Sequence, residues 1–460
     1  MYDVIIIGAG LSGISAGVRL SYYGRKVRIL ERQLYPGGLN SYYERDGRIV
    51  DVGLHALTNF VPEGIRSAPL NTFLRQMRIR RHELDLCPQT FSEIIFPQCT
   101  LRLNNDFPAF AAQVERLFPA DAAGFRRLCE RIRQTDAFSP TAPELSARSI
   151  VNDYLSSPLL QDMLLCPVML YGNPQAEDMD FNQFCIIFRS VIFEGFGRPH
   201  HGMKPFLECL LKRYRDQGGE LSLGVEVTKL NVCDGRIASV VTDQGEELHA
   251  DAILSCAGAL ETARLCSSPP PELASFPAGP IGFCESIFEL NRRPRELGLE
   301  ACVIFRNCQE RFQFSPPAGD VDLSCQILCM PGNYQHCDDI ADANTVRVSV
   351  LASPARWLAL PSGAVYDKAK SNVVDAQIAL MEAWKPGFAD AVVDWEMFTP
   401  KTIERFTGRV NGVIYGSPRK LRQGASDELS NLFICGADQG FLGIVGALMS
   451  GAAIANRHLL

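Results

Sequence analysis

The chain has 460 residues, a formal net charge of −7 and sixteen cysteines. A chain of this length exceeds what one hydrophobic core usually supports, so we expect two interleaved domains with enough interior to enclose a ligand. The mixed charges, without a block of Lys and Arg, argue against nucleic-acid binding, and the scattered cysteines, without a C-x-x-C pair, indicate reduced core thiols.

The N-terminal segment predicts a strand over residues 3–7, a helix over 11–24 and a second strand over 26–31. Together they form a βαβ unit, which is half of a doubly wound sheet. Because the first strand starts at Tyr2, the sequence leaves no room for a signal or transit peptide, and a cytoplasmic location is expected.

Three glycines, Gly8, Gly10 and Gly13, join this strand to the helix in the pattern G-x-G-x-x-G. The first permits a tight turn, the second lets the backbone approach a diphosphate, and the third lets helix and strand pack closely. The positive end of the helix would stabilise the phosphates by roughly 0.3 to 2 kcal/mol. Glu31 ends the second strand, where a carboxylate can bind a ribose diol and disfavours a 2′-phosphate. The alternative is an ordinary βαβ turn with a surface glutamate.

The next segment, ERQLYPGGLNSYYERDG, contains Arg32 and the pair Gly37-Gly38. These residues resemble the second fingerprint of flavoproteins that have two dinucleotide-binding domains, which an NAD enzyme does not need. Alone, Gly37-Gly38 could equally be a plain turn. Together with the first glycine motif and the C-terminal segment, it indicates FAD.

The middle of the chain alternates between two patterns. Residues 60–195 are helical and loop-like with frequent proline, and a helix over 203–217 precedes alternating strands that return to the first sheet. Between 265 and 410, runs such as GFCESIFEL and TVRVSVLA predict a second, mostly antiparallel sheet with helices. We expect an α/β fold with a doubly wound, Rossmann-like FAD-binding domain (1–60, 200–265 and 410–460) and an interleaved α+β substrate or cap domain (61–199 and 266–409).

The C-terminal segment NLFICGADQGFLGIVGALMSG predicts a strand, a turn and a helix that rejoin the N-terminal domain. The turn would place Asp438 at a sugar-alcohol chain and the start of the helix toward a flavin ring. Residues 439–456 carry no charge over a length that could span a membrane. Their four glycines favour instead a buried helix that touches another backbone.

These stretches together resemble the FAD-dependent phytoene desaturase, carotenoid isomerase and retinol saturase family, within the amine-oxidase-like flavoprotein superfamily. The resemblance runs along nearly the whole chain. It rests on YDVIIIGAGLSG, LYPGGLNSYYERDGRIVDVGLHAL, GRPHHGMKPFLECLLKRYRDQGGELSLGVEVTKL, TPKTIERFTGRVNGVIYGSP and NLFICGADQGFLGIVGALMSG. It implies FAD as the cofactor, adenine contact through the backbone of Val227, and ribitol binding by Asp438. It also implies cofactor contacts from Leu39, Gly436, Gly443 and Ile444.

Flavin chemistry needs few side chains, because the ring exchanges the hydride at N5 and the protein orients the substrate and excludes water. An acid or base would move the companion proton. His200 and His201, in the turn that the family places on the substrate side, are the first candidates because imidazole titrates near neutral pH. His55 lies in a segment that the family places near the flavin. Each histidine could instead be structural, as an exposed turn residue, a packing pair or a partner of backbone groups.

The expected substrate is an apolar isoprenoid or polyene that is desaturated, saturated or isomerised. The run QFCIIFRSVIFEGFG could line a channel or simply be a buried helix face, and salt bridges are expected for Arg189, Glu194 and Arg198. No metal site is predicted. An apolar substrate leaves open a peripheral association with a membrane, and the sequence does not indicate an oligomeric state.

Two alternatives remain. The first is an amine oxidase or porphyrinogen-oxidase-like flavoenzyme. An aromatic pair and a carboxylate near the flavin would favour this alternative, whereas a long apolar tunnel would favour the polyene hypothesis. The second is a non-enzymatic binding protein like the GDP-dissociation inhibitors. Proteins of that kind have lost parts of the phosphate and flavin turns, which this chain keeps.

Overall fold

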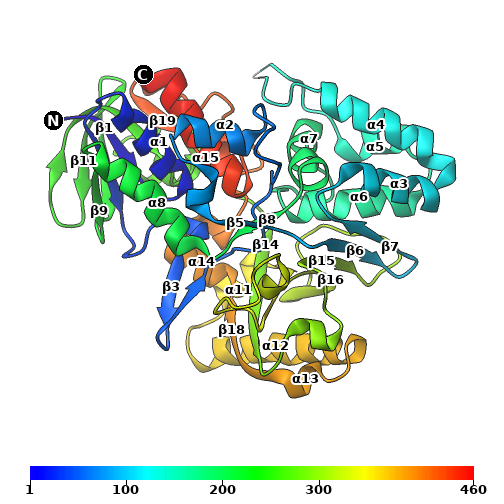
Figure 1. Cartoon of the computed structure of the whole chain (residues 1–460). Coiled ribbons are helices and arrows are strands. Elements are labelled where there is room, and N and C mark those ends of the chain that lie inside the picture. Colours follow the sequence, from blue (N-terminus) through cyan, green and yellow to red (C-terminus); the bar gives the residue numbers. More distant parts are fainter. Residues whose placement is uncertain (140) are drawn as a thin grey trace.

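The computed structural model describes residues 1–139 and 141–460. Figure 1 shows both chain termini beside one sheet, a group of helices (α3–α7) on the opposite side of the molecule, and a second sheet with α12 below them.

A five-stranded parallel sheet contains both ends of the chain, in the order β19-β13-β1-β2-β9. Its strands are β1 (Tyr2–Ile7), β2 (Val27–Glu31), β9 (Glu220–Leu223), β13 (Ala250–Ser255) and β19 (Leu432–Ile434). In β1, Val4 and Ile6 pack into one apolar cluster and Ile5 and Ile7 into another. The strand is therefore buried on both faces, which is why its sequence is an unbroken apolar run.

Two layers cover this sheet. On one face lie α1 (Leu11–Tyr22), α2 (Pro69–Gln76), α8 (Met203–Asp216) and α15 (Gly443–Ile454). On the other lie α9 (Ala259–Leu265), α10 (Pro271–Ala274) and the antiparallel sheet of β10 (Val227–Cys233), β11 (Arg236–Thr242) and β12 (Glu247–Leu248). The expected βαβ unit and the return of the C-terminal segment to the first sheet are confirmed.

The glycine-rich helix α15 packs against α1. The Ser15 hydroxyl donates to the Leu448 carbonyl at 2.6 Å, and a Cβ atom on Gly451 would lie 1.9 Å from the Ser12 carbonyl oxygen. The uncharged run is thus a buried helix in close backbone contact, as predicted. Among the described residues, no helix combines the length and the hydropathy needed to cross a membrane.

A second sheet of seven strands has the order β18-β14-β17-β16-β15-β6-β7 and is antiparallel except for the pair β15 and β6. Its strands are β6 (Ser92–Phe96), β7 (Cys99–Leu103), β14 (Gly282–Leu290), β15 (Val303–Asn307), β16 (Val321–Cys329), β17 (Thr345–Ala352) and β18 (Val392–Phe398). One face packs on α11 (Pro354–Ala359), α12 (Ala364–Trp384) and α13 (Phe388–Ala391). The other packs on α3 (Phe107–Leu117), α4 (Ala122–Gln134), α5 (Ala147–Tyr154), α6 (Pro158–Leu170) and α7 (Phe181–Phe188).

The hairpin β6–β7 corrects the expectation that residues 60–195 are only helical and loop-like. The two strands are joined by a two-residue turn, with Phe96 opposite Cys99. In β6 the side chains alternate between buried and half-buried, a period that the surrounding prolines obscure in the sequence. The second neighbour of β6 in the sheet is β15, in which Ile304 pairs with Glu93. Because this neighbour is distant in the sequence, the pairing leaves no local signal.

Two short ladders connect the parts of the molecule: β3 (Tyr42–Arg45) with β4 (Arg48–Asp51), and β5 (Leu86–Pro88) with β8 (Gly197–Pro199). All sixteen cysteines are free, and most are buried, as predicted. The division into two domains at residues 60, 199, 265 and 409 stays a prediction.

Candidate active site

The loop between β1 and α1 is formed by the glycines of the first motif. A Cβ atom on Gly13 would lie 2.1 Å from the Gly8 carbonyl oxygen, so the helix packs directly on the loop. A Cβ atom on Gly10 would meet no atom within 4 Å, which leaves open space at the start of the helix. α1 begins without a side-chain cap, and its first N–H groups have no intrahelical acceptor. The loop therefore has the donors and the room that a diphosphate needs.

The pair Gly37-Gly38 lies against the same loop. The Gly37 N–H donates to the Ala9 carbonyl at 2.8 Å, and a Cβ atom on Gly38 would lie 3.4 Å from the Gly10 Cα. Gly37 has a φ of 113°, a backbone conformation that favours glycine. Leu39 follows, half-buried, in the short turn Gly38–Asn40. The two glycine motifs thus meet in space.

Glu31 is buried beside this loop. Its carboxylate accepts hydrogen bonds from the N–H groups of Ala9 at 2.7 Å and Gln33 at 2.8 Å. Burial raises the pKa of the Glu31 carboxyl, although these N–H groups act in the opposite direction. The Val225 N–H donates to the Glu31 carbonyl at 2.9 Å, which brings the start of β10, with its buried Val227, alongside.

Arg32 joins the end of β2 to the helix α14 (Pro400–Thr407). Its Nη2 donates to the Arg405 carbonyl at 2.8 Å, and its Nη1 lies 3.6 Å from the Glu226 carboxylate. In the structure, Arg32 thus holds the TPKTIERFTG segment against the dinucleotide fold. A contact of Arg32 with FAD stays a prediction.

The turn between β19 and α15 reaches the start of α1. A Cβ atom on Gly436 would lie 3.4 Å from the Ser12 hydroxyl, and the Gly436 N–H donates to the Ser450 hydroxyl at 2.6 Å. α15 begins without a side-chain cap, as α1 does, and its first residue, Gly443, is exposed whereas Ile444 is buried. A second uncapped helix start therefore belongs to the same region.

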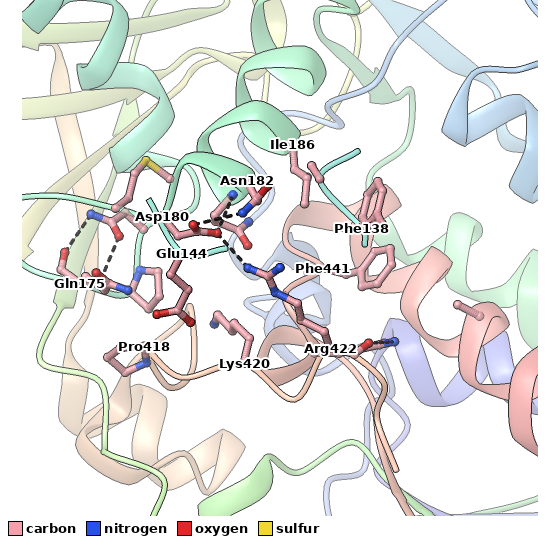
Figure 2. A pocket seen from close by; sticks show the side chains of 18 of the residues that line it. Phe138, Glu144, Gln175, Asp180, Asn182, Ile186, Pro418, Lys420, Arg422 and Phe441 are labelled. Carbon is pink, nitrogen blue, oxygen red and sulfur yellow. Dashed lines mark hydrogen bonds and ion pairs between the residues drawn. The ribbon is translucent and has the colours of Figure 1, made fainter. Parts of the chain in front are cut away.

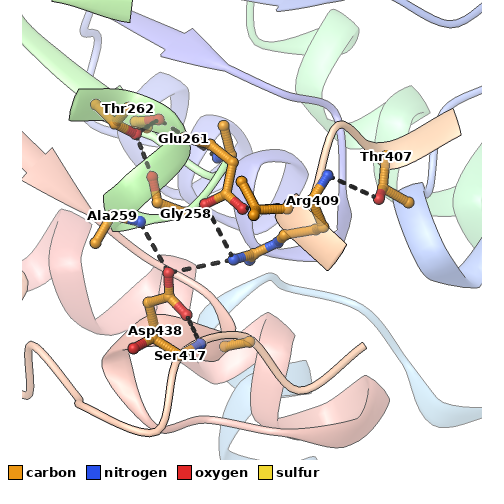
Figure 3. A network of polar contacts seen from close by, with 12 residues as sticks. Gly258, Ala259, Glu261, Thr262, Thr407, Arg409, Ser417 and Asp438 are labelled. Atoms are coloured by element: carbon orange, nitrogen blue, oxygen red, sulfur yellow. Dashed lines mark hydrogen bonds and ion pairs between the residues drawn. The ribbon is translucent and has the colours of Figure 1, made fainter. Parts of the chain in front are cut away.

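Asp438 in this turn is the centre of a buried polar network (Figure 3). One carboxylate oxygen accepts from the Ser417 N–H at 2.8 Å, and the other accepts from the Ala259 N–H at 2.8 Å and from Arg409 at 3.2 Å. Burial raises the pKa of Asp438, but Arg409 and Lys420 outweigh that effect and lower it. The carboxylate is thus engaged by the protein itself, and its predicted ribitol contact stays a prediction.

Lys420 lies half-buried near Asp438. Its ammonium donates to the carbonyls of Tyr415 at 3.1 Å and Ala437 at 3.0 Å. Burial lowers the pKa of Lys420 to about 8, with Arg409 acting in the same direction and Asp438 in the opposite one. This lysine therefore adds positive charge to the turn at neutral pH.

These residues fit FAD. The start of α1 has free donors and open space for a diphosphate, the Glu31 carboxylate lies beside it, and the exposed start of α15 offers N–H donors to the acceptor groups of a flavin ring. The buried carboxylate of Glu31 does not suit the 2′-phosphate of NADP.

His55 lies in a second buried network. Its Nε2 is 3.2 Å from the Glu285 carboxylate and 3.3 Å from the Ser349 hydroxyl, and its carbonyl accepts from the Tyr334 hydroxyl at 3.0 Å. Burial would raise the pKa of Glu285, but Arg347 and His55 lower it to about 2. His55 is therefore held beside a carboxylate that stays ionised. Its acid–base role stays a prediction.

His200 and His201 are stacked on a turn after β8, with ring centroids 4.2 Å apart. His200 is half-buried and its Nδ1 lies 3.0 Å from the Asp85 carboxylate, whereas His201 is exposed. Their partners differ from those of His55. Their acid–base role also stays a prediction.

The flanking charged residues have different partners. Arg198 is buried between Asp51 at 3.3 Å and Asp342 at 2.7 Å, which is the ion pair expected for it. Arg189 instead donates to backbone carbonyls, including that of Thr135 at 2.6 Å, and Glu194 accepts from the Asn59 amide at 2.8 Å. The run QFCIIFRSVIFEGFG forms α7 and a following π-helical turn, largely buried in the core.

A pocket of about 70 Å³ lies between α7 and the C-terminal segment (Figure 2). Phe138 and Phe441 stack on each other at one side of it with centroids 4.9 Å apart, and Arg422 pairs with Asp180 at 3.1 Å. Small-molecule sites usually have roughly 300 Å³ or more. This pocket is therefore too small for a polyene.

Sequence reasoning missed Arg409, Lys420, Ala259, Glu285 and Arg347. A usable signal existed for Ala259 only, because it follows β13, whose carboxyl end lies beside that of β1. The others reach their partners through side chains from distant segments.

A family model described as flavin containing amine oxidoreductase matches residues 11–315. Prolycopene isomerase 1, chloroplastic, of an Oncidium hybrid cultivar is 24% identical over 99% of this chain and 83% of its own length. Phytoene desaturase (neurosporene-forming) of Rhodobacter capsulatus is 24% identical over 95% of this chain and 90% of its own length. The solved structure of wild-type putrescine oxidase bound to putrescine superposes with a TM-score of 0.66 at 16% identity, covering 100% of this chain and 99% of that one. The expected doubly wound flavoprotein fold is confirmed.

Proposed function

The chain belongs to the flavin containing amine oxidoreductase family and is an FAD-dependent oxidoreductase; we propose that its substrate is an apolar isoprenoid or polyene, which it desaturates, saturates or isomerises. The observation that carries this proposal is similarity along nearly the whole chain to a prolycopene isomerase and a phytoene desaturase. The similarity includes the segments outside the dinucleotide fold, where a substrate would be selected.

For the cofactor, we propose that the α1 loop (Gly8, Gly10 and Gly13) holds the diphosphate, and that Glu31 binds the adenosine ribose. By the family resemblance, we assign the adenine to Val227 and the second glycine motif to Arg32, Gly37, Gly38 and Leu39. We assign the ring and ribitol end to Gly436, Asp438, Gly443 and Ile444. When bound, FAD supplies a hydride acceptor or donor at N5.

The surroundings of the C-terminal turn support an apolar substrate. Leu442, which directly precedes α15, belongs to the large apolar cluster of the helical region. A Cβ atom on Gly172 would lie 2.7 Å from the Ile187 side chain and 3.3 Å from that of Leu442. Tyr171 next to it packs on Phe305 with centroids 4.9 Å apart. Apolar and aromatic side chains therefore border the turn that we assign to the flavin.

Three carboxylates in the interior of the molecule do not favour a cationic amine. Asp51, Glu285 and Asp438 are each paired with an arginine, namely Arg198, Arg347 and Arg409. A substrate ammonium group would have to displace one of these guanidinium groups, which costs several kcal/mol, of order 3 to 5. This arrangement supports the polyene over the amine.

For proton transfer we propose His55. Glu285 and Ser349 fix the orientation of its ring. A histidine so held can take a proton from, or return one to, a carbon next to the reacting bond. His200 and His201 remain the alternative candidates.

The proposal is tested with purified protein loaded with FAD under anaerobic conditions. Oxidised enzyme is mixed with polyenes, sterol precursors and amines, and bleaching of the flavin band is recorded. Reduced enzyme is mixed with the same panel, and the products are separated by chromatography. Desaturation predicts bleaching by a polyene, saturation predicts flavin re-oxidation by a polyene, and isomerisation predicts a changed polyene without net change of the flavin.

A panel in which only amines react would overturn the polyene proposal and leave the FAD assignment standing. Loss of flavin during purification and failure to rebind it would contradict the cofactor assignment instead. His55→Gln should lower the turnover number with little change in flavin content. Membrane association and the domain boundaries stay predictions.

A further inference from the structure

The turn that contains the two histidines is fixed by the short ladder of β5 and β8. Cys87 pairs with Arg198 in this ladder, and the N–H of His200 donates to the carbonyl of Asp85 at 2.8 Å. Asp85 directly precedes β5, and His200 directly follows β8. The backbone thus presents an aspartate and two histidines at one end of the ladder.

A second segment reaches the same place. The loop between β16 and β17 is joined to both strands of this ladder. The Gln335 N–H donates to the Pro88 carbonyl of β5 at 3.0 Å, and Asp342 pairs with Arg198 of β8 at 2.7 Å. This loop brings the carboxylate of Asp339 to 3.4 Å from the Nε2 of His200. Two carboxylates therefore flank one imidazole.

The polar atoms of this cluster are arranged like a ligand set. One oxygen or nitrogen atom from each of Asp85, His200 and His201 lies within 4.8 Å of the others, and His200 Nδ1 is 3.0 Å from Asp85 Oδ2. Two ligands of a tetrahedral ion with bonds of about 2.0 to 2.1 Å are roughly 3.3 Å apart. The exposed side chains of Asp85 and His201 are free to close the remaining distance.

The unused nitrogen of His200 is a second, independent observation. Its Nε2 is buried and has no hydrogen-bond partner among the described residues, although it faces Asp339. In metal sites, the nitrogen of a ligating histidine that does not bind the ion usually donates to a carboxylate. Asp339 is placed for that role once a metal on Nδ1 fixes the proton at Nε2.

We propose that Asp85, His200 and His201 bind a divalent ion of the zinc class, with Asp339 as the residue that orients His200. Imidazole nitrogens favour Zn²⁺, Ni²⁺, Cu²⁺ and Co²⁺ over Mg²⁺ and Ca²⁺. The ion would tie the loop that carries Asp339 to the β5–β8 ladder. With three protein ligands the ion would keep one position for water, and the proposal does not depend on the proton transfer proposed for His55.

The test uses the full chain with FAD bound, freed of metal by a chelator and gel filtration. Co²⁺ is titrated and its visible absorption recorded, because nitrogen and oxygen ligands give ligand-field bands without the charge-transfer band of cysteine thiolates. Zn²⁺ affinity is then measured by competition with a chromophoric chelator, with Mg²⁺ as the comparison ion. We expect one Co²⁺ per chain, displaced by Zn²⁺ and not by Mg²⁺, and a melting temperature raised by roughly 2 to 5 °C.

Single substitutions identify the ligands. His201→Gln and Asp85→Asn should weaken Zn²⁺ binding by about 100-fold or more, and Asp339→Asn by about 10-fold. His249→Gln, which changes another exposed histidine on a distant strand connection, should leave the affinity as in the wild type.

If a variant does not fold, protection of His201 from diethyl pyrocarbonate by Zn²⁺ in the wild-type protein gives the same information. Absence of ligand-field bands, affinity unchanged in His201→Gln, or modification of His201 unaffected by Zn²⁺ would each overturn the proposal.

Discussion

The two ends of the chain and its middle differ in how their polar sites are formed. At the ends, short runs of consecutive residues shape the backbone: glycines make room at the start of α1 and fix the turn at Gly37, while two helices begin without a cap. In the middle, the polar centre of Glu285, Arg347 and His55 depends on side chains from three separate segments. Backbone shape is encoded locally, whereas a side-chain network is encoded only by the complete fold.

The largest effect is expected in the middle region. Glu285→Gln removes the charge that compensates the buried Arg347, and the free energy of unfolding should fall by about 4 kcal/mol. Glu289→Gln, on the same strand but at an exposed position paired with Arg48, should change it much less. Urea denaturation of both variants measures the difference, and equal losses would refute the special role of Glu285.

Gly13→Ala should have the next largest effect, now at the N-terminal end. The added Cβ would lie 2.1 Å from the Gly8 carbonyl oxygen, so helix and strand must separate, and the protein should lose about 3 kcal/mol of stability. Gly64→Ala is the control, because its Cβ would meet no atom within 4 Å. A wild-type melting curve for Gly13→Ala would show that the loop is not packed as described.

Glu31→Gln tests the N-terminal end through FAD binding; because the amide can accept from only one of the Ala9 and Gln33 N–H groups, stability is measured alongside. Losing one charge-assisted hydrogen bond to the ribose should weaken FAD binding by about 2 kcal/mol. Equilibrium dialysis against FAD measures this, with Glu246→Gln, at an exposed ion pair, as the control. Unchanged retention would argue against the ribose role.

The contribution of Glu285 to the free energy of unfolding should decline gradually as the pH falls. Because the pKa of Glu285 is lowered from 4.5 to about 2 in the folded protein, its stabilising contribution is complete above pH 4.5 and is lost as the pH falls toward 2. Between pH 7 and pH 3.5 the wild type should lose roughly 1 kcal/mol through this group. The stability of Glu285→Gln should fall less than that of the wild type over this interval. Parallel stability profiles of the two proteins would contradict the lowered pKa of Glu285.

The same contrast explains what could be predicted. The βαβ unit and the return of the C-terminal segment to the first sheet follow from local patterns, since glycine spacing and strand burial leave direct marks in the sequence. The contact of Gly37-Gly38 with the first glycine motif was not predicted, because it joins two separate loops. The β6–β7 hairpin was missed because its partner strand, β15, is distant in the sequence.

The candidate site divides in the same way. Asp438 could be found from its turn, but its partners Arg409, Ala259 and Ser417 come from three other segments. Likewise, His200 and His201 were conspicuous in the sequence, whereas the approach of Asp85 and Asp339 to them depends on the β5–β8 ladder and on the loop docked against it. Charges that meet through tertiary contacts have no signature at any one position.

The central claim is that both ends of the chain hold one FAD molecule. It is tested most directly by amide hydrogen exchange of the FAD-free protein with and without added FAD, using Gly10→Ala as a variant whose added Cβ enters the open space at α1. We predict that the starts of α1 and α15 become protected together in the wild type, and that both stay unprotected in Gly10→Ala. Protection at only one of the two helix starts would contradict the account.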